Sequence, residues 1–597
     1  MLEKTLFRRT ILLLSAFFLP MFGACTASDG TERPQPTATE VAAASNKVDC
    51  EWKPAVADTI LCNAEVFTMD ESRPWAQAVA IRDGRILYVG DDAGVDAFLG
   101  SGTKVIDLGG RMVMPGFHDV HMHPLEAGSL VGGTCQLDGE SDPHDFLDTF
   151  AQCGPQQIGT PWVLGFGFSI ITLLEAETAP RLILDEGLGD TPAAMMEETS
   201  HSVWVNTAAL RALGIERGTP DPPGGIIARD PRTGEPNGLL IDNAGDLAFE
   251  KAFAPTDELM QLHYEGLLFS LDRLARNGIT SFCDARTYWT RGFHEVYRRA
   301  EREGTLTARA VLGLWAYPQK EDAEQLRTLK SMYDNKPNRL VRLSQIKVYS
   351  DGIVHNGTAA LLAPYRNSPN LAGPTGLNYF DEERLATYIT ELERVGFDFH
   401  IHAIGDRGVR EALNAIETAR GRNGDRYRRR HRLTHVEMVD PADRHRFAQL
   451  DVIADFQVAG SFTDPSHRDE SAWFIGSRAR DFVPVRSIWD TGATVTLSSD
   501  WDVSDLNPFV GIQRSLFREH QSLPDLATAL RCYTLNAAYA MGQEKETGSL
   551  VVGKYADLIV LDRNVFQVEP ETIGRTRVLV TMLGGRTVFR DPSATFF

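Results

Sequence analysis

Cysteines are scarce in this chain, and long apolar runs are rarer still. The 597 residues include 7 cysteines and no C-x-x-C pair, which argues against a cysteine-ligated zinc site. After the first 24 residues, no apolar stretch is long enough to cross a bilayer. Lysine and arginine number 60 against 81 acidic residues, for a formal charge of -21. This acidic balance argues against nucleic acid or an anionic membrane surface as a partner.

The N-terminus has the pattern of a bacterial export signal. Basic residues at 4, 8 and 9 precede the apolar run 11–22, and the small pair Gly23-Ala24 precedes Cys25. Phe22-Gly23-Ala24-Cys25 resembles a lipobox. We therefore predict a signal peptide over 1–24, with the mature protein in the periplasm or anchored to the membrane by a lipid on Cys25. Cleavage without lipidation stays open, as does the choice between general and twin-arginine export.

Residues 25–55 are rich in Thr, Ala and Pro and lack periodicity, which predicts a disordered tether. An oxidising compartment permits disulfides. Cys135 and Cys153 flank one short polar segment and are the preferred pair, whereas spacing alone cannot decide whether Cys50 bonds to Cys62. Two other cysteines, Cys283 and Cys532, lie in apolar segments and are predicted to be buried thiols.

Strand-like and helical segments alternate through the middle of the chain, which is typical of βα units and a parallel sheet. Eight strands close a (β/α)8 barrel of the TIM type. The expected strands are the one that leads into His121 and the segments 278–285, 309–315, 345–351, 397–403, 432–438, 451–457 and 494–500. Region 125–260 has no place in this series, so we predict that it is an insertion over the barrel mouth.

Short alternating segments occur at both ends of the chain, over 59–108 and over 553–588. Because both ends of the chain show the same pattern of short alternating segments, we predict one small β-sandwich assembled from both termini. The expected domains are therefore a sandwich from 56–112 plus 545–597 and a barrel over 113–544, which carries the insertion.

His121 and His123 alternate along the first expected barrel strand. Residues i and i+2 of a strand project from one face, so the two imidazoles aim at one point, as a divalent metal requires. Other polar residues, Lys347, His402, His435 and Asp500, each come at or near the end of a later apolar run. Barrel active sites lie at the C-terminal ends of the strands, so we expect these side chains to converge.

These residues belong to motifs that resemble the amidohydrolase superfamily, and most closely its branch of N-substituted formamide deformylases. The motifs are PGFHDVHMHP at 115–124, HSVWVN at 201–206, KVYSDG at 347–352, TAALLAPY at 358–365, HAIGD at 402–406, THVE at 434–437 and SSD at 498–500. The resemblance covers about residues 56–590. It implies metal-dependent hydrolysis of a non-peptide carbon–nitrogen bond of an amide, N-formyl or N-acyl substrate by a metal-activated hydroxide.

The resemblance also implies roles for individual residues. His121, His123 and Asp500 would hold one divalent ion, and His402 and His435 a second. Lys347, if carboxylated on N6, would bridge them. Zinc suits these donors best, with one or two ions per chain. Asp500 would act as general base and then general acid, with His402 as its catalytic partner in the second metal's site.

Several other residues are candidate substrate contacts or structural residues. His201 and Trp204 of the insertion are candidate substrate contacts, with ordinary packing equally open for Trp204. His400 shares a face with His402 but lies one pleat deeper, and His118 faces away. Three further histidines lie in charged, loop-like surroundings and are predicted to be solvated: His144, His445 and His467.

Two other functions remain open. The same site could hydrolyse an ester, lactone or carbamate, or the chain could be a binding lipoprotein without turnover. A small-molecule substrate is expected in each case. The oligomeric state is left undetermined, with a homodimer as one option.

Overall fold

We analysed a computed structural model, which describes residues 55–597 apart from 129–133, 158, 175, 177, 369–370, 425–426, 428 and 461–462. The predicted signal peptide and nearly all of the predicted tether, with Cys25 and Cys50, lie outside the described residues. Pro54–Phe597 forms one compact unit. Within the described part of the chain, no helix combines the length and the apolar character needed to cross a membrane.

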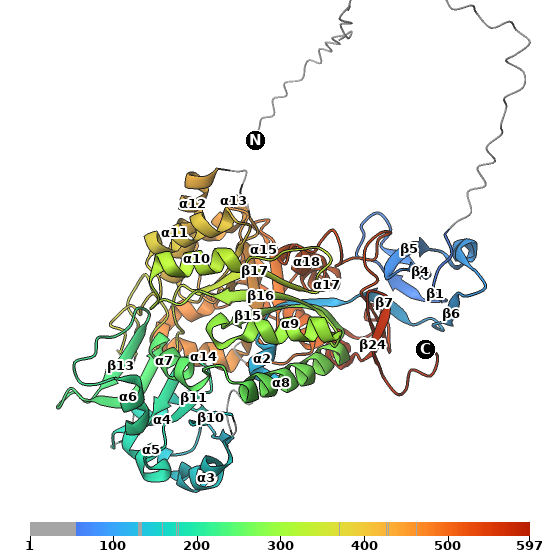
Figure 1. The fold of residues 1–597 in the computed structure, drawn as a ribbon. Coiled ribbons are helices and arrows are strands. Elements are labelled where there is room, and N and C mark those ends of the chain that lie inside the picture. Colours follow the sequence, from blue (N-terminus) through green and yellow to red (C-terminus); the bar gives the residue numbers. More distant parts are fainter. Residues whose placement is uncertain are drawn as a thin grey trace, which may run out of the picture. The chain divides into compact units, whose positions relative to one another are not determined.

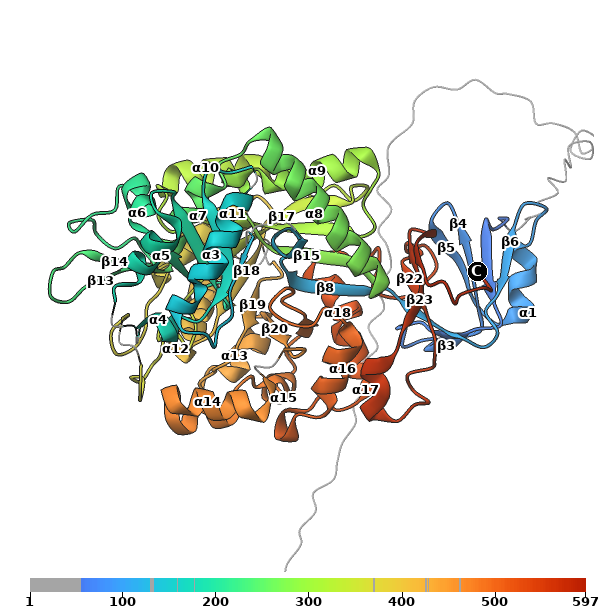
Figure 2. The same ribbon diagram turned by 90° about the horizontal axis from the view of Figure 1, so that it is seen from below.

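The centre of this unit is an eight-stranded parallel barrel (Figures 1 and 2). Its strands follow one another around the sheet in chain order: β8 (Phe117–Met122), β15 (Ile279–Thr287), β16 (Arg309–Trp315), β17 (Val341–Tyr349), β18 (Asp398–Ala403), β19 (Arg432–His435), β20 (Ile453–Gln457) and β21 (Val495–Ser498). Just beyond β21, the amide of Asp500 donates to the carbonyl of His121 at 2.8 Å, so the last strand meets the first. The predicted (β/α)8 barrel is confirmed.

Burial explains why these segments form strands. Every residue of β15, β16 and β17 is buried, as expected for parallel strands that are covered on both faces. The helices associated with the barrel are α8 (Asp257–Arg276), α9 (Phe293–Glu303), α10 (Asp322–Met332), α11 (Glu382–Glu393), α12 (Asp406–Asn423), α13 (Arg444–Gln449), α14 (Pro465–Ile475), α15 (Val485–Trp489), α16 (Pro508–Leu516), α17 (Leu526–Cys532) and α18 (Leu535–Ala540). Cys283 and Cys532 are fully buried, as predicted.

Two sheets form the β-sandwich, one from the N-terminal part of the described chain and one from both of its ends. One sheet contains β1 (Thr59–Cys62), β4 (Ala78–Arg82), β5 (Arg85–Gly90) and β6 (Lys104–Asp107). The other has the order β24 (Arg586–Arg590), β23 (Val578–Leu583), β22 (Leu558–Leu561), β7 (Met112–Pro115), β2 (Glu65–Phe67) and β3 (Trp75–Ala76). Apolar side chains of both sheets share one core, and Figure 1 shows red and blue segments side by side there.

A buried ion pair joins the barrel to the sandwich. Arg309 of β16 donates from Nε and Nη2 to the two oxygens of Asp557, at 2.7 and 3.1 Å, and both side chains are almost fully buried. Removing one partner of such a pair leaves an uncompensated buried charge.

We therefore expect Asp557→Ala to lower the free energy of unfolding by about 3–5 kcal/mol, measured by chemical denaturation. The matched control is Asp272→Ala, which removes an exposed pair with Arg276 and should cost less than about 1 kcal/mol. Equal losses in the two variants would contradict a stabilising role for the buried pair.

The insertion folds around a sheet of its own. In order across the sheet, its strands are β13 (Gly225–Arg229), β14 (Pro236–Asp242), β12 (Ser202–Val205), β11 (Ala193–Glu197), β10 (Val163–Phe168) and β9 (Cys135–Gln136). Cys135 and Cys153 form a disulfide with a Cα–Cα distance of 5.1 Å, which confirms the preferred pair. The open pair of Cys50 with Cys62 involves a residue outside the described part of the chain.

Candidate metal centre

The six predicted ligands all lie at one rim of the barrel. His121 is on β8 and His123 follows that strand directly, Lys347 is on β17, and His402 is on β18. His435 ends β19, and Asp500 comes two residues after the end of β21. Because the strands are parallel, these positions share the C-terminal rim of the barrel, where barrel active sites form.

Asp500 is at the centre of the cluster. Its Oδ1 lies 3.2 Å from Nε2 of His121 and 3.2 Å from Nε2 of His123. Its Oδ2 lies 3.9 Å from Nδ1 of His435. Ligand atoms of His121, His435 and Asp500 all fall within 4.8 Å of one another, a spacing that a single cation could bridge after small side-chain adjustments.

His402 and Lys347 extend the cluster on its other side. The rings of His402 and His435 are 4.6 Å apart. Nδ1 of His402 and Nζ of Lys347 are both buried, and neither has a hydrogen-bond partner among the described residues. Buried polar atoms are rarely left without partners, so these two atoms fit a site completed by a bound group.

Electrostatics in the cluster favour cation binding. Burial lowers the pKa of the Lys347 amine well below its ordinary range. Burial, together with His435, does the same for the pKa of His402. Burial raises the pKa of Asp500, but His121 and the hydrogen bonds from His121 and His123 outweigh this and hold it well below its ordinary value. Neutral imidazoles with an ionised carboxylate are the donors that a divalent metal requires. His123 is the exception: burial lowers its pKa, but the hydrogen bonds to Asp500 and Glu126 outweigh this and raise the pKa to about 9, so this ring must lose a proton to bind a metal.

A layer of polar side chains, which the sequence analysis did not single out, packs around these ligands. Tyr349 stacks on His402 with ring centres 4.2 Å apart, and its hydroxyl accepts from Arg286 at 3.1 Å. Arg286 pairs with Glu126, which lies 3.3 Å from Nδ1 of His123. The sequence spacing could have identified two of these positions. Tyr349 is two residues after Lys347 on one strand face, and Glu126 is three residues after His123.

The inside of the barrel supports His121 from below. His400, one pleat deeper than His402 as predicted, places Nε2 2.8 Å from Nδ1 of His121. Arg432 donates to Nδ1 of His400 at 2.7 Å. His118 points elsewhere, toward Thr547 at 2.8 Å. Contacts that fix the free nitrogen of a ligating histidine hold its ring in place.

His201 brings the insertion to the site. Its Nδ1 lies 2.8 Å from Oδ1 of Asp242, which also accepts from the hydroxyl of Tyr379 at 2.9 Å. A carboxylate only accepts hydrogen bonds, so Nδ1 of His201 carries the proton and Nε2 remains available to a substrate. The ring lies 5.3 Å from that of His402.

The structure does not bring Trp204 to the site. Its side chain is fully buried in the core of the insertion, packs against Phe150 and Phe168, and donates to the carbonyl of Pro180 at 2.8 Å. Ordinary packing therefore accounts for its position. Trp204 is close to His201 in sequence, but this closeness does not place it in the pocket. Alternate residues of the strand point into the insertion core.

The cluster opens into a pocket of about 340 Å³, counting space open to solvent. Polar residues dominate its lining: His121, His123, Thr199, Ser200, His201, Arg286, Tyr349, His402, His435, Asp500, Asp502 and Val503. Of the predicted ligands, only Lys347 does not line it. The pocket therefore combines the barrel rim with a segment of the insertion.

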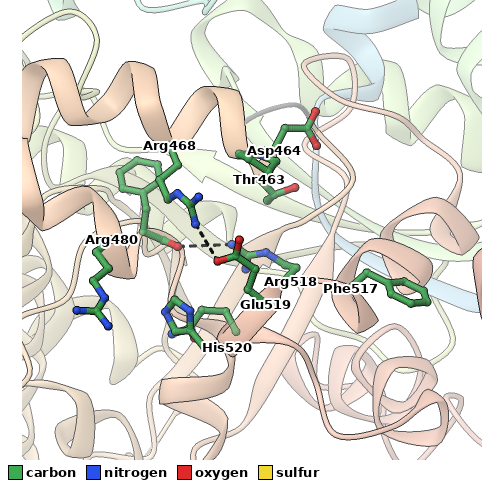
Figure 3. Close-up of a pocket in the computed structure, with 11 residues that line it drawn as sticks. Thr463, Asp464, Arg468, Arg480, Phe517, Arg518, Glu519 and His520 are labelled. Atoms are coloured by element: carbon green, nitrogen blue, oxygen red, sulfur yellow. Dashed lines mark hydrogen bonds and ion pairs between the residues drawn. The ribbon is translucent and has the colours of Figure 1, made fainter.

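A second pocket lies away from the cluster and contains none of the predicted ligands (Figure 3). Arginines and acidic residues line it, and Arg468 pairs there with Glu519 at 3.0 Å. Arg518 donates to the backbone carbonyl of Val483 at 2.9 Å. Two of its arginines are thus engaged with an acidic side chain or with the backbone, and the candidate site remains the pocket at the barrel rim.

Comparison with known proteins identifies the family of the chain. Residues 104–589 match the amidohydrolase family. The chain is 30% identical to Protein LONG AFTER FAR-RED 3 of Arabidopsis thaliana, over 89% of this chain and 92% of that protein. It is 27% identical to an N-substituted formamide deformylase of Arthrobacter pascens, over 88% and 97%. An uncharacterized metal-dependent hydrolase from Pyrococcus horikoshii shares the fold, with a TM-score of 0.66 at 22% identity, over 86% of this chain and 99% of that chain. The chain therefore belongs to the amidohydrolase family.

Proposed function

We propose that this protein hydrolyses a non-peptide carbon–nitrogen bond of a small amide, N-formyl or N-acyl substrate. One observation carries the proposal: imidazoles from three barrel strands converge with the carboxylate of Asp500 near Lys347, whose buried amine has no hydrogen-bond partner among the described residues. The relative named for formamide deformylation supports the choice of bond.

The donor set indicates which residues would hold metal. His121, His123 and Asp500 would bind one divalent ion, and His402 and His435 a second. Imidazole and carboxylate donors suit zinc. When bound, the metal supplies Lewis-acid charge at the scissile carbonyl and lowers the pKa of water.

Lys347 would complete the site as a carbamate. Its neutral amine can attack carbon dioxide, forming an N–C bond and releasing one proton, and the product offers two anionic oxygens where the unmodified amine offers none. The buried, unpartnered Nζ and the lowered pKa of its amine both favour this modification. An unmodified, cationic lysine would repel a metal.

Side chains of the protein would transfer the protons of the reaction and stay in position beside the substrate. Asp500 would accept the proton of the attacking water at a carboxylate oxygen and return it to the leaving nitrogen, as general base and then general acid. An amine leaves poorly without a proton, so this second step matters more for an amide than for an ester. His402 would keep its place beside the substrate carbonyl through its stacking on Tyr349.

His201 would contact the substrate through Nε2. We expect His201→Asn to lower kcat/KM by about 10- to 100-fold, because one hydrogen-bond partner of the bound substrate is lost. Metal per chain, measured by elemental analysis, should stay at the wild-type level because His201 is not a ligand. The matched control is the exposed His144→Asn, which should change neither quantity. Loss of metal in His201→Asn would make it a ligand instead.

A matched substrate series tests the proposed bond. Zinc-loaded protein should hydrolyse an amide or N-formyl amine with higher kcat/KM than the ester or lactone of the same acyl group, and chelation should stop both reactions. Turnover of esters alone would favour the ester hydrolase. Tight binding without turnover of any member, unaffected by chelators, would favour the binding lipoprotein.

A further inference from the structure

A second group of metal-type side chains lies outside the catalytic pocket. We define the His355 cluster as His355, His467 and Glu470. His355 is in the turn 354–357 of the loop after β17, and the other two are on α14, the helix that follows β20. One nitrogen from each ring and one oxygen of Glu470 all lie within 4.8 Å of one another.

The local structure brings the three side chains together. His467 and Glu470 are three residues apart on α14 and so share a helix face, with Nδ1 and Oε2 3.8 Å apart. The rings of His355 and His467 have centres 4.6 Å apart. His355 also packs edge-on against Phe474, one turn further along α14, at 5.1 Å. His467 was predicted to be solvated in a loop, but it is half-buried on a helix, whereas His144 and His445 are exposed. The burial of His467 depends on its neighbours in the folded structure around α14, and the charged residues near it in the sequence do not predict it.

A buried nitrogen of the cluster lacks a partner. Nε2 of His355 is inaccessible to solvent and has no hydrogen-bond partner among the described residues. Leaving such an atom unsatisfied costs free energy. A cation bound between the two rings would give this nitrogen the partner that the protein does not supply.

We propose that the His355 cluster binds a divalent transition-metal ion of the zinc class. Two imidazoles and one carboxylate form a three-ligand set that is common for zinc, with water in the fourth position. Zinc–ligand bonds of about 2.1 Å place tetrahedral donors about 3.4 Å apart. The side chain of Glu470 is 65% exposed and that of His467 is 20% exposed, so both have room to rotate inward.

The bound ion would hold two segments of the barrel together. It would join the loop that leaves β17, the strand of Lys347, to the helix that leaves β20. In the same loop, Asp351 accepts from the amides of Ala360, Ile404 and Gly405 at 2.8–3.0 Å. None of the three cluster residues lines the pocket at the barrel rim, so this site would be separate from the metal site proposed there.

Metal stoichiometry tests the proposal. The full chain, Glu470→Gln and His467→Gln are equilibrated with excess Zn²⁺, freed of unbound metal and analysed for zinc. We expect each variant to hold one zinc fewer per chain than the wild type. Exposed residues of the same types provide the controls, Glu258→Gln and His445→Gln, which should match the wild type. Thermal unfolding without added metal checks that all variants fold.

The difference in zinc content between the variants and the wild type reports on this site alone, because the variants leave the barrel cluster intact. A failed hydrolysis screen therefore leaves this test unaffected. Crystals soaked in Zn²⁺ should show anomalous density between the rings of His355 and His467. Equal zinc content in the wild type and both folded variants would overturn the proposal and reduce the cluster to aromatic packing.

Discussion

Replacing Asp500 with asparagine is expected to lower kcat/KM by at least about 10³-fold. Asparagine has the same shape but cannot accept a proton, and its amide is a poor metal ligand. Oδ1 of Asp500 lies 3.2 Å from Nε2 of His121 and 3.2 Å from Nε2 of His123, and these contacts would lose the carboxylate charge. Steady-state kinetics on the best amide substrate measures the effect.

The fold should tolerate this change. The backbone amide of Asp500 keeps its bond to the carbonyl of His121, so the thermal unfolding midpoint should stay close to that of the wild type. The same substitution at Asp490, which pairs with Arg486 on the surface, is the matched control and should leave kinetics unchanged. Near-normal turnover in Asp500→Asn would remove this residue from the proposed mechanism.

Replacing Lys347 with alanine is the second change with a large expected effect. We expect kcat/KM to fall by about 10²-fold or more and bound metal to decrease, because the two anionic oxygens that a Lys347 carbamate would offer to a metal are lost. Lys347→Glu returns one anionic carboxylate to the same strand and should recover part of the bound metal. Elemental analysis and kinetics measure both effects.

Depletion of carbon dioxide tests the carboxylation of Lys347 more directly. Metal-free wild-type protein loaded with zinc in carbon dioxide-depleted buffer should regain activity only after bicarbonate is added. Lys330→Ala, which removes a half-exposed pair with Glu391, should behave like the wild type. Full reactivation without bicarbonate would show that the amine acts unmodified.

The barrel was predictable from sequence because its strands are buried on both faces. Arg309–Trp315 reads as a compact apolar run, whereas Asp398–Ala403 alternates polar and apolar residues, and helical segments separate the strands. The same order of strands around the barrel places His121, Lys347, His402, His435 and Asp500 at one rim. Position along a strand and strand order were sufficient to assemble this group.

Contacts between strands that are distant in sequence could not be predicted in the same way. The bond between His400 and His121, and the Arg286 contact that holds Tyr349, depend on side-chain lengths and rotamers. The insertion was predicted only as a block, because its short strands mix parallel and antiparallel pairing. His201 and Trp204 are near neighbours in sequence, yet one lines the pocket and the other fills the insertion core.

The second sandwich sheet has a consequence for how the cell makes this protein. β22, near the C-terminus, pairs directly with β7, which precedes the first barrel strand. A ribosome therefore releases an open strand edge early and delivers its partner only with the final residues. Until then β7 can pair with another nascent chain. A premature stop codon between the end of β7 and residue 558 would leave that edge permanently available for aggregation.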